Sequence, residues 1–435
     1  MGQVVYLLLE MPRQRVVSSV RYWLDILGFG EKQIYNNKSF CILPWIHLYI
    51  GPTGDAHPCC VRQPNSEPLG HLRNESLKSI WNSEKTKKFR KDLREGRRRP
   101  EVCNTCYARE ETEGTSHRLE FNRKFYHHIK PRLKQTKDDG ELVNDTWAYW
   151  DFRLSNKCNF KCRTCGPKFS TAWQLENKVF FQEESEQFKP YWQQGFEHLK
   201  QASQSLEEIY FAGGEPLIID EHYQLLEWLI EKKKTNVVLS YNTNMSVLTY
   251  KQWNVMELWE KFEHVYVSPS LDHFGERAEY IRKGTKFDSL LENLLLLQKK
   301  KNIQLRPTMT LSNLNISDFP EIHAFYLEKG LIKNPNHFAA NVLRAPYFYH
   351  MSVLPLEVKN RILDKITDYN QKLKKQYGEE LNCYPLLLEE LRKNGEHHFP
   401  KFIEHTVNLD RVRGENGLKT LDVWGEQRDS ISEKI

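Results

Sequence analysis

The sequence predicts an α/β protein built around a parallel sheet, with a different small region before the sheet and helices after it. Strand-like and helix-like runs alternate from about residue 147 to residue 350, as crossover connections between parallel strands require. After Pro355 only helical patterns remain. The chain has 435 residues, which is too long for one ordinary domain and suits two or three.

Composition excludes several classes of protein. Apolar residues make up 39% of the chain and aromatic residues 12%, which is enough for a packed core and excludes a largely disordered chain. No apolar run approaches the roughly 20 residues needed to cross a bilayer, and the first residues show no secretory signal. We therefore expect a cytoplasmic protein that does not enter a membrane. Its nine cysteines are not expected to form a disulfide framework.

The first elements precede the alternating region. Residues 1–35 form an N-terminal segment, with an amphipathic helical pattern near residues 16–27. Residues 40–60 read as two short strands around a turn that contains glycine and proline. Leu77 to Arg94 has helical spacing, and residues 107–145 read as a charged connecting helix and linker.

The alternating region then supplies the strands and helices of the sheet. The predicted strands are Tyr149–Leu154, Ile209–Ala212, Val237–Tyr241, His264–Ser270, Ile303–Leu311 and Phe338–Leu343. The predicted helices between them are Ser170–Phe181, Glu221–Lys233, Tyr250–Phe262, Asp288–Lys300 and Phe319–Lys329. Three further helices are predicted near residues 356–376, 384–394 and 399–413.

Charge is concentrated in one segment. The formal net charge is +6, but Lys85 to Arg99 holds nine basic and two acidic residues, so the rest of the chain is close to neutral. Such a run can bind nucleic acid or an acidic partner, although a solvated helix face is the commoner explanation. Few aromatic residues are interleaved with it, so nucleic acid is not the expected partner.

Three cysteines follow the first strand of the alternating region: Cys158, Cys162 and Cys165, spaced C-x3-C-x2-C. Cysteine thiolates at such short spacings hold cubane iron–sulfur clusters. Because only three are local, one iron would lack a protein ligand, and an open coordination position is what a reactive metal site needs. The alternative is a zinc site completed by a distant fourth ligand.

A glycine-rich turn follows the second strand, where IYFAG runs into Gly213-Gly214-Glu215-Pro216. Glycines there allow the backbone to approach a ligand closely, and Glu215 is expected to place a carboxylate at the rim. The C-x3-C-x2-C loop and the GGEP segment lie about fifty residues apart in a β/α alternation. In this combination the sequence resembles the radical SAM superfamily.

The resemblance implies a fold and a chemistry. The fold is a partial (β/α)6 TIM-type barrel over residues 147–350, with ligands at the carboxyl ends of its strands. Cys158, Cys162 and Cys165 would bind a [4Fe–4S] cluster whose open iron chelates S-adenosylmethionine. Reductive cleavage of that cofactor would release a 5′-deoxyadenosyl radical, which abstracts a substrate hydrogen. The chain is thus expected to be an enzyme that needs an electron donor such as flavodoxin or ferredoxin.

The same resemblance implies S-adenosylmethionine contacts. The methionine group would meet Gly213, Gly214, Glu215 and Pro216, and the ribose would meet Ser270 and Asp272. Asn244 and Arg282 match positions near the same ligand. Members commonly have an aromatic residue before the third cysteine, but Thr164 stands here. The adenine contact is therefore expected from Phe160 or from the region around Val342 and Leu343.

A second group of cysteines precedes the alternating region: Cys41, Cys59, Cys103 and Cys106. Their spacing, C-x17-C with a glycine between and a later C-x2-C, resembles the SPASM and twitch domains of radical SAM enzymes. The resemblance implies one auxiliary [4Fe–4S] cluster in a small α+β iron–sulfur module, which here precedes the barrel instead of following it. Four cysteines could instead bind zinc. Cys60 could replace Cys59 or be buried as a small apolar residue.

The predicted organisation is an N-terminal segment (1–35), a twitch-like module (36–120), a linker (121–146), the barrel (147–350) and a C-terminal helical region (351–435). The expected substrate is a peptide, a protein or a small molecule. Two other functions stay open. One is an RNA-modifying radical enzyme that docks through residues 85–99, and the other is a non-catalytic binding protein stabilised by metal.

Overall fold

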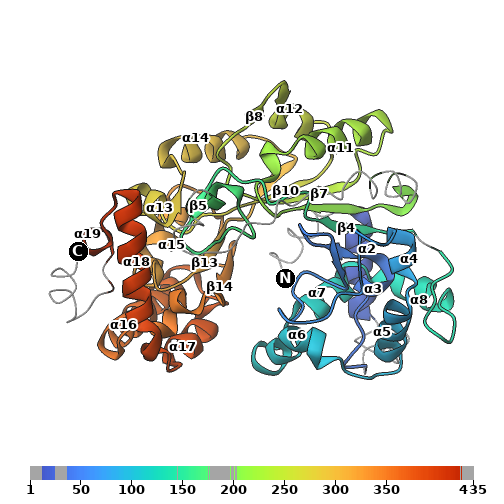
Figure 1. The fold of residues 1–435 in the computed structure, drawn as a ribbon, viewed down its shortest axis with the longest axis horizontal. Helices are drawn as coiled ribbons and strands as arrows, with labels where there is room; N and C mark the ends of the chain where they lie inside the picture. Colours follow the sequence, from blue (N-terminus) through green and yellow to red (C-terminus); the bar gives the residue numbers. More distant parts are fainter. Residues whose placement is uncertain are drawn as a thin grey trace. The chain divides into compact units, whose positions relative to one another are not determined.

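A computed structural model describes residues 12–24, 37–144, 146–174, 176, 196, 200, 203–421 and 423. The chain divides into two compact units (Figure 1). The first unit comprises residues 1–155, 187–212 and 236–239, and the second comprises residues 156–186, 213–235 and 240–435.

The first unit begins with helix α2 (Arg13–Leu24), helix α3 (Leu43–Ile46) and strands β1 (Tyr49–Ile50), β2 (Asp55–His57) and β3 (Gly70–His71). The predicted pair of strands around a turn is confirmed, because β1 and β2 pair antiparallel across residues 51–54. Gly54 has φ +90°, a backbone conformation that glycine adopts without strain. The stretch before the turn forms α3 instead of a longer strand, with Pro44 in its first turn.

The described part of this unit also contains helices α4 (Leu77–Trp81), α5 (Glu84–Arg94), α6 (Pro100–Glu113), α7 (His117–Lys124) and α8 (Tyr126–Lys134). The single helix predicted over residues 77–94 is two helices. Ser76 and Ser83 explain the division, since each is an N-cap whose hydroxyl accepts a hydrogen bond from the backbone three residues later. The first half of the predicted linker (121–146) is helical, because the end of α7 and the whole of α8 lie there.

Strands β4 (Tyr149–Phe152) and β6 (Glu208–Phe211) form the sheet of the first unit with β1, in the order β6-β4-β1-β2-β3. β4 pairs parallel with both β6 and β1. The first two strands predicted for the alternating region are therefore confirmed. The pairing of β1 with β4 was not predicted, and it joins the cysteine-bearing N-terminal region to the same sheet.

The second unit holds most of β7 (Val238–Thr243), together with β10 (Val265–Pro269), β12 (Ile303–Leu305), β13 (Thr308–Leu311) and β14 (Ala339–Val342). β10 pairs parallel with β12, and β13 pairs parallel with β14. The strand predicted over residues 303–311 is divided at Pro307, because proline has no N–H for a sheet hydrogen bond. The pairing confirms a mostly parallel α/β fold.

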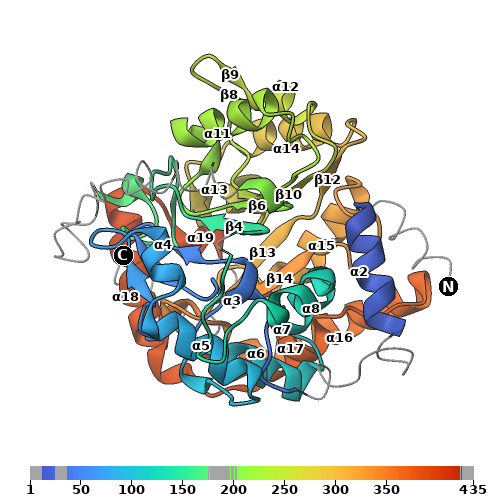
Figure 2. The same cartoon turned by 90° about the vertical axis from the view of Figure 1, so that its right-hand side faces the viewer.

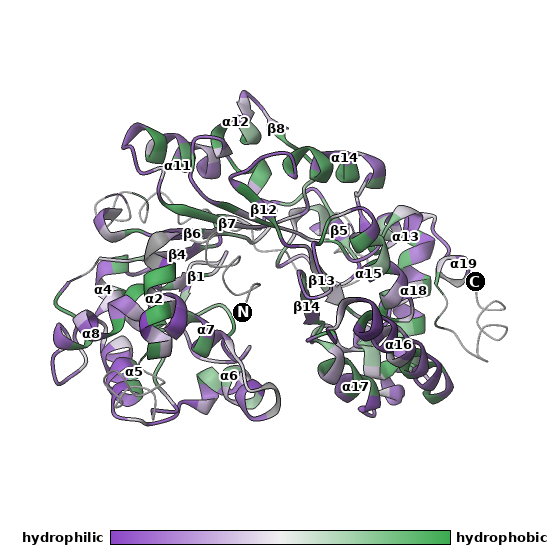
Figure 3. Ribbon diagram, turned by 180° about the vertical axis from the view of Figure 1, so that it is seen from behind, coloured by the Kyte–Doolittle hydropathy of each residue, from purple (hydrophilic) through white to green (hydrophobic). Residues whose placement is uncertain are grey.

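Helices α11 (Asp220–Glu231), α12 (Val255–Trp259) and α14 (Phe287–Leu297) lie along one side of β7, β10 and β12 (Figures 1 and 2). Figure 3 shows hydrophobic residues in β7 and β12, as expected for covered strands. The predicted helix near residues 250–262 is shorter, since the β8–β9 hairpin (Thr249–Tyr250, Trp253–Asn254) occupies its first part. Of the helix predicted over residues 170–181, residues 171–173 are 3-10 helix, and most of the rest lies outside the described residues.

The second unit also contains helices α13 (Gly275–Ile281) and α15 (Phe319–Glu328) and the C-terminal helices α16 (Leu356–Tyr377), α17 (Tyr384–Arg392), α18 (Phe399–Arg413) and α19 (Gly417–Thr420). The three helices predicted after Pro355 are confirmed. None of the helices that the structure describes is long and apolar enough to cross a membrane.

Candidate cluster and cofactor site

The three cysteines of the predicted reactive cluster lie on one loop of the second unit. Cys162 is in the short strand β5 (Lys161–Cys162), which pairs antiparallel with β11 (Arg282–Lys283). The loop turns tightly after it, because the N–H of Cys165 donates to the carbonyl of Cys162 at 3.0 Å. Trp173 Nε1 donates to the same carbonyl at 3.2 Å. These contacts hold the loop in a defined conformation without using the sulfur atoms.

Burial suppresses ionisation of the three thiols as long as no metal is bound. It raises the pKa of Cys158 to about 11 and that of Cys165 to about 12, and it also raises the pKa of Cys162. The Arg282 guanidinium opposes this shift at all three thiols. Bound iron would favour the thiolates outright. The donor set therefore fits a sulfur-ligated cluster better than a free catalytic thiol.

Sulfur spacing bears on the zinc alternative. A tetrahedral zinc site with Zn–S bonds of about 2.3 Å places its sulfurs about 3.8 Å apart. Within the described part of the chain, no three cysteine sulfurs lie within 4.8 Å of one another. A cubane cluster is larger than a single ion, so its ligands stand further apart. The described cysteine sulfurs are therefore not spaced as the ligands of a single tetrahedral zinc ion.

In the GGEP segment the two glycines are partly exposed, whereas the side chains of Glu215 and Pro216 are buried. Gly213 and Gly214 have φ values of +84° and +58° and are partly exposed, whereas the flanking Ala212, Glu215 and Pro216 are buried. The left-handed conformation at both glycines would strain other residues. The exposed part of the segment is therefore bare main chain, which a ligand can approach closely.

Glu215 differs from its expected place at the rim. Its side chain is only 1% exposed. One carboxylate oxygen accepts hydrogen bonds from Thr243 Oγ1 at 2.6 Å and the N–H of Leu217 at 3.1 Å, and the other accepts from the N–H of Asn244 at 2.6 Å. These bonds join the GGEP turn to the end of β7. The buried Glu215 side chain therefore fixes the position of the turn.

Asn244 connects the end of β7 to the cysteine loop. Its amide Nδ2 donates to Asn159 Oδ1 at 2.9 Å, between Cys158 and Phe160 in the sequence. Its Oδ1 accepts from the N–H of Ser246 at 2.9 Å. The GGEP turn also reaches this loop, because the N–H of Glu215 donates to the carbonyl of Lys157 at 2.7 Å. The two motifs identified in the sequence are thus hydrogen-bonded neighbours.

Asp272 and Arg282 form a buried ion pair beside the cysteines. Asp272 Oδ2 lies 2.8 Å from an Arg282 guanidinium nitrogen, and Oδ1 accepts from the N–H of Thr310 at 2.7 Å. Burial alone would lower the pKa of Arg282, but the charges of Cys162, Asp272 and Cys158 raise it above its usual value. Ser270 follows β10, and its N–H donates to the carbonyl of Thr243 at 2.9 Å. The structure therefore brings Asp272, Arg282 and the cysteine loop together.

Phe160 is placed differently from the expectation of an adenine contact. Its side chain is 2% exposed and lies against Gly284. Little ring surface remains for a ligand, so Phe160 is better explained as a packing residue of the cysteine loop. The alternative region near Val342 and Leu343 lies at the end of β14.

Gly284 gives a direct test of this packing. It has φ +113°, and a Cβ atom there would lie 2.8 Å from Phe160 Cδ1 and 3.0 Å from the carbonyl oxygen of Asn159. Gly284→Ala should therefore displace the cysteine loop and cost roughly 1–3 kcal/mol of stability through backbone strain and overpacking. We expect faster loss of iron to a chelator from reconstituted protein. The matched control is Gly330→Ala, which also has positive φ (+66°) but has no heavy atom within 4 Å of its Cβ position. Equal iron loss in the two variants would contradict the prediction.

Sequence reasoning missed a buried arginine inside the cysteine loop. Arg163 forms ion pairs with Asp410 at the end of α18 and with Glu415 beyond it. Its guanidinium carbon lies 3.7 Å from the centre of the Tyr280 ring, and its Nε donates to the Tyr280 carbonyl at 3.1 Å. The Arg163 side chain is fully buried. The C-terminal region therefore holds the loop between Cys162 and Cys165.

Arg413 makes a second attachment of the same kind. It pairs with Glu176 at 2.8 Å, donates to the carbonyl of Lys161 at 2.9 Å and lies over the Trp173 ring at 4.8 Å. Sequence separations of more than 230 residues explain why no local pattern predicted these contacts.

The four cysteines assigned to an auxiliary cluster come together in the first unit. They derive from three segments: Cys41 before α3, Cys59 after β2, and Cys103 and Cys106 within α6. Burial raises the pKa of all four thiols, and neighbouring cysteines of the group raise those of Cys41, Cys59 and Cys103 further. Arg118 lies beside this group, and its positive charge lowers the pKa of Cys41 and Cys106. Four such thiols beside one cation, of which Cys106 is buried and the other three are partly exposed, can saturate a cubane cluster.

Cys60 faces a different group from Cys59. Burial raises its pKa to about 12, and the negative charge of Asp151 on β4 contributes to this rise. Asp151 is fully buried and lies 3.1 Å from Arg153. This placement favours Cys59 as the cluster ligand. Cys383 precedes α17, and burial raises its pKa to about 12, as in an unreactive thiol.

Known families match both regions of the chain. Residues 152–326 match the family model of the Radical SAM superfamily, and residues 41–107 match that of SPASM, an iron–sulfur cluster-binding domain. The chain therefore belongs to the radical SAM superfamily, whose members are enzymes. More particularly, it is a radical SAM protein in which the SPASM domain precedes the radical SAM domain. Its cofactors are a [4Fe–4S] cluster with S-adenosylmethionine, and auxiliary iron–sulfur binding in the SPASM domain. No curated protein sequence matches the chain.

Solved structures of low identity also align with it. One is native anSMEcpe with bound AdoMet, at 17% identity and a TM-score of 0.37, over 53% of this chain and 61% of that chain. Another is SuiB of Streptococcus suis bound to S-adenosylmethionine, at 16% identity and a TM-score of 0.33, over 61% of this chain and 52% of that chain. A third is TYW1 with a lysine-pyruvate adduct, at 14% identity and a TM-score of 0.28, over 53% and 71%. The chain thus spans about three fifths of anSMEcpe and half of SuiB.

Proposed function

We propose that this protein reductively cleaves S-adenosylmethionine at a cluster held by Cys158, Cys162 and Cys165, and uses the radical to abstract hydrogen from a peptide, a protein or a small molecule. When bound, the cluster and S-adenosylmethionine supply the electron transfer and the 5′-deoxyadenosyl radical. An electron donor such as flavodoxin or ferredoxin would reduce the cluster. One auxiliary [4Fe–4S] cluster on Cys41, Cys59, Cys103 and Cys106 completes the proposal.

The observation that carries the proposal is the network joining the cysteine loop to the GGEP turn. Asn244 bonds to Asn159, and the N–H of Glu215 bonds to Lys157. Glu215 holds the turn from beneath, which leaves the main chain of Gly213 and Gly214 to bind the amino group of the cofactor. Asp272 and Ser270 would meet the ribose. Arg282 keeps positive charge next to the thiolates and neutralises part of their charge.

Anaerobic reconstitution with iron and sulfide, followed by iron quantification and an assay for 5′-deoxyadenosine, tests the proposal. We expect about eight irons per chain, from two [4Fe–4S] clusters, and 5′-deoxyadenosine that depends on a reductant. Zinc in place of iron, without cleavage, would refute it. Substrate candidates are then compared by the increase in 5′-deoxyadenosine that each one causes.

The structure weakens the RNA-docking alternative, because acidic side chains and a backbone carbonyl already pair with several basic residues of the segment 85–99. Arg90 is buried, donates to the carbonyl of Pro44 at 2.7 Å and lies over Trp81 at 4.2 Å. Asp92 pairs with both Arg97 at 2.6 Å and Arg99 at 2.8 Å. Lys87 pairs with Glu84 and Asp139. Much of the charge that would release counterions from RNA is thus already neutralised.

A further inference from the structure

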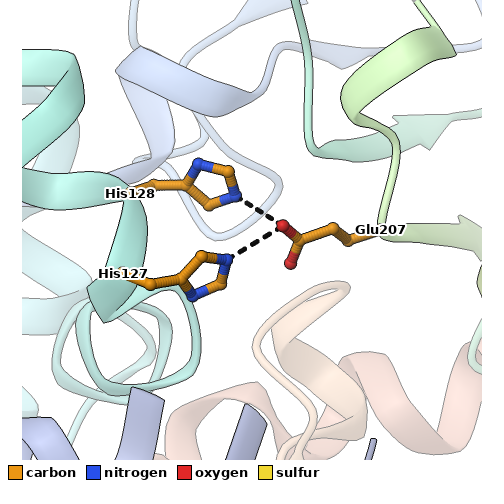
Figure 4. A group of neighbouring side chains, drawn as sticks. All are labelled: His127, His128 and Glu207. Atoms are coloured by element: carbon orange, nitrogen blue, oxygen red, sulfur yellow. Dashed lines mark hydrogen bonds and ion pairs between the residues drawn. The ribbon is translucent and has the colours of Figure 1, made fainter. Parts of the chain in front are cut away.

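Two histidines and one glutamate converge in the first unit (Figure 4). His127 and His128 are consecutive residues of α8, and Glu207 directly precedes β6. Both imidazole rings point Nε2 toward the same carboxylate oxygen, at 2.9 Å from His127 and 2.7 Å from His128. Within the described residues, this is the one group of three or more such side chains whose ligand atoms all lie within 4.8 Å of one another.

The chemical types of the three side chains suit a cation. Imidazole nitrogen and carboxylate oxygen are the atoms that ligate zinc alongside thiolate sulfur, and here the three ligand atoms all lie within 4.8 Å of one another.

The surroundings also resemble those of a metal site. His127 Nδ1 lies 2.5 Å from Ser18 Oγ of α2, and such a partner on the second ring nitrogen orients a ligating histidine. Side-chain exposures of 15–20% leave room for water to complete the coordination. Two positive side chains bear on cation binding here. The charge of Lys124 is paired with Glu208 at 2.5 Å. The charge of Arg132 opposes a positive charge at His128.

We propose that His127, His128 and Glu207 bind one zinc ion, at a site separate from the cysteine clusters. Two imidazoles and one carboxylate with an open position form a recurrent zinc ligand set, and they lack the soft sulfur that iron–sulfur clusters require. Zn–N and Zn–O bonds of about 2.0–2.1 Å place tetrahedral ligands about 3.3 Å apart. The observed 2.7 Å and 2.9 Å separations therefore need only a few tenths of an ångström of opening. The ion would cross-link α8 to the start of β6.

The test measures zinc in full-length protein whose iron–sulfur clusters have been fully reconstituted, so that the cysteines are occupied. The protein is incubated with zinc chloride and desalted, and zinc is quantified by mass spectrometry. We expect about one zinc per chain, lost at least tenfold in His127→Ala and in Glu207→Gln. The matched control is His117→Ala, which removes another histidine that faces a glutamate, Glu120 at 3.8 Å, and should retain the zinc.

X-ray absorption at the zinc edge distinguishes this site from misloaded cysteines. Only nitrogen and oxygen neighbours near 2.0–2.1 Å support the proposal, and sulfur neighbours near 2.3 Å overturn it. Absence of zinc from the reconstituted wild-type protein, or its retention in both variants, also overturns it. The iron content of each variant shows whether the chain has folded. It also separates this result from the cleavage assay, because zinc binding does not depend on radical chemistry.

Discussion

Replacing Cys158, Cys162 and Cys165 together with alanine should abolish the formation of 5′-deoxyadenosine while leaving about four of the eight irons expected from two cubane clusters. The structure gives the reason for the selective loss. The three loop thiols belong to the second unit, whereas Cys41, Cys59, Cys103 and Cys106 belong to the first. Loss of one set of ligands therefore leaves the other set complete. Iron quantification and the cleavage assay on the same sample provide the measurement.

The control for that variant is Cys383→Ala. Cys383 is also a cysteine of the second unit with a pKa raised by burial, but it lies at the start of α17 and outside the loop. It should keep all the iron and full cleavage. If the triple variant retains no iron and X-ray absorption shows zinc with sulfur neighbours near 2.3 Å, the four cysteines of the first unit bind zinc, and the proposed auxiliary cluster is wrong. Cleavage that persists in the triple variant would refute the assignment of the reactive cluster.

Local patterns in the sequence predicted the parallel α/β fold and the residues that gather at its candidate site. Alternation of strands and helices depends on hydrophobic periodicity, which neighbouring residues encode. The C-x3-C-x2-C and GGEP segments are likewise short. Their environment was harder to predict, because burial depends on the whole fold. Glu215 was expected at the rim and is buried, and the ring of Phe160 packs against Gly284.

Contacts between distant segments could not be predicted from one sequence. β1 pairs with β4 about one hundred residues later, and Arg163 meets Asp410 across 247 residues. No periodicity or spacing rule connects such positions. Charge patterns did indicate that residues 85–99 are basic, but they could not show that Asp92, Asp139 and the carbonyl of Pro44 already pair with them.

Asp410→Ala is expected to destabilise the protein by about 3–5 kcal/mol, because it removes a partner from a buried guanidinium. Asp410 is 2% exposed and pairs with Arg163. It also accepts hydrogen bonds from the Tyr280 hydroxyl at 3.0 Å and from the N–H of Gly417. Because Arg163 lies between Cys162 and Cys165, iron should also be lost to a chelator faster than from wild-type protein. Urea unfolding and the rate of iron loss measure the two effects.

The matched control is Arg411→Ala, which removes an exposed charge from the same helix and should change stability by no more than about 0.5 kcal/mol. The double variant Arg163→Leu/Asp410→Leu separates pairing from simple loss of charge, since replacing both members of a buried pair with apolar residues is often close to neutral. Glu415 then keeps Lys283, 2.8 Å away, as its partner. The double variant should therefore recover much of the stability lost in Asp410→Ala. If it is instead as unstable as the single variant, hydrogen bonding to Tyr280 and Gly417, and not the ion pair, is the main contribution of Asp410.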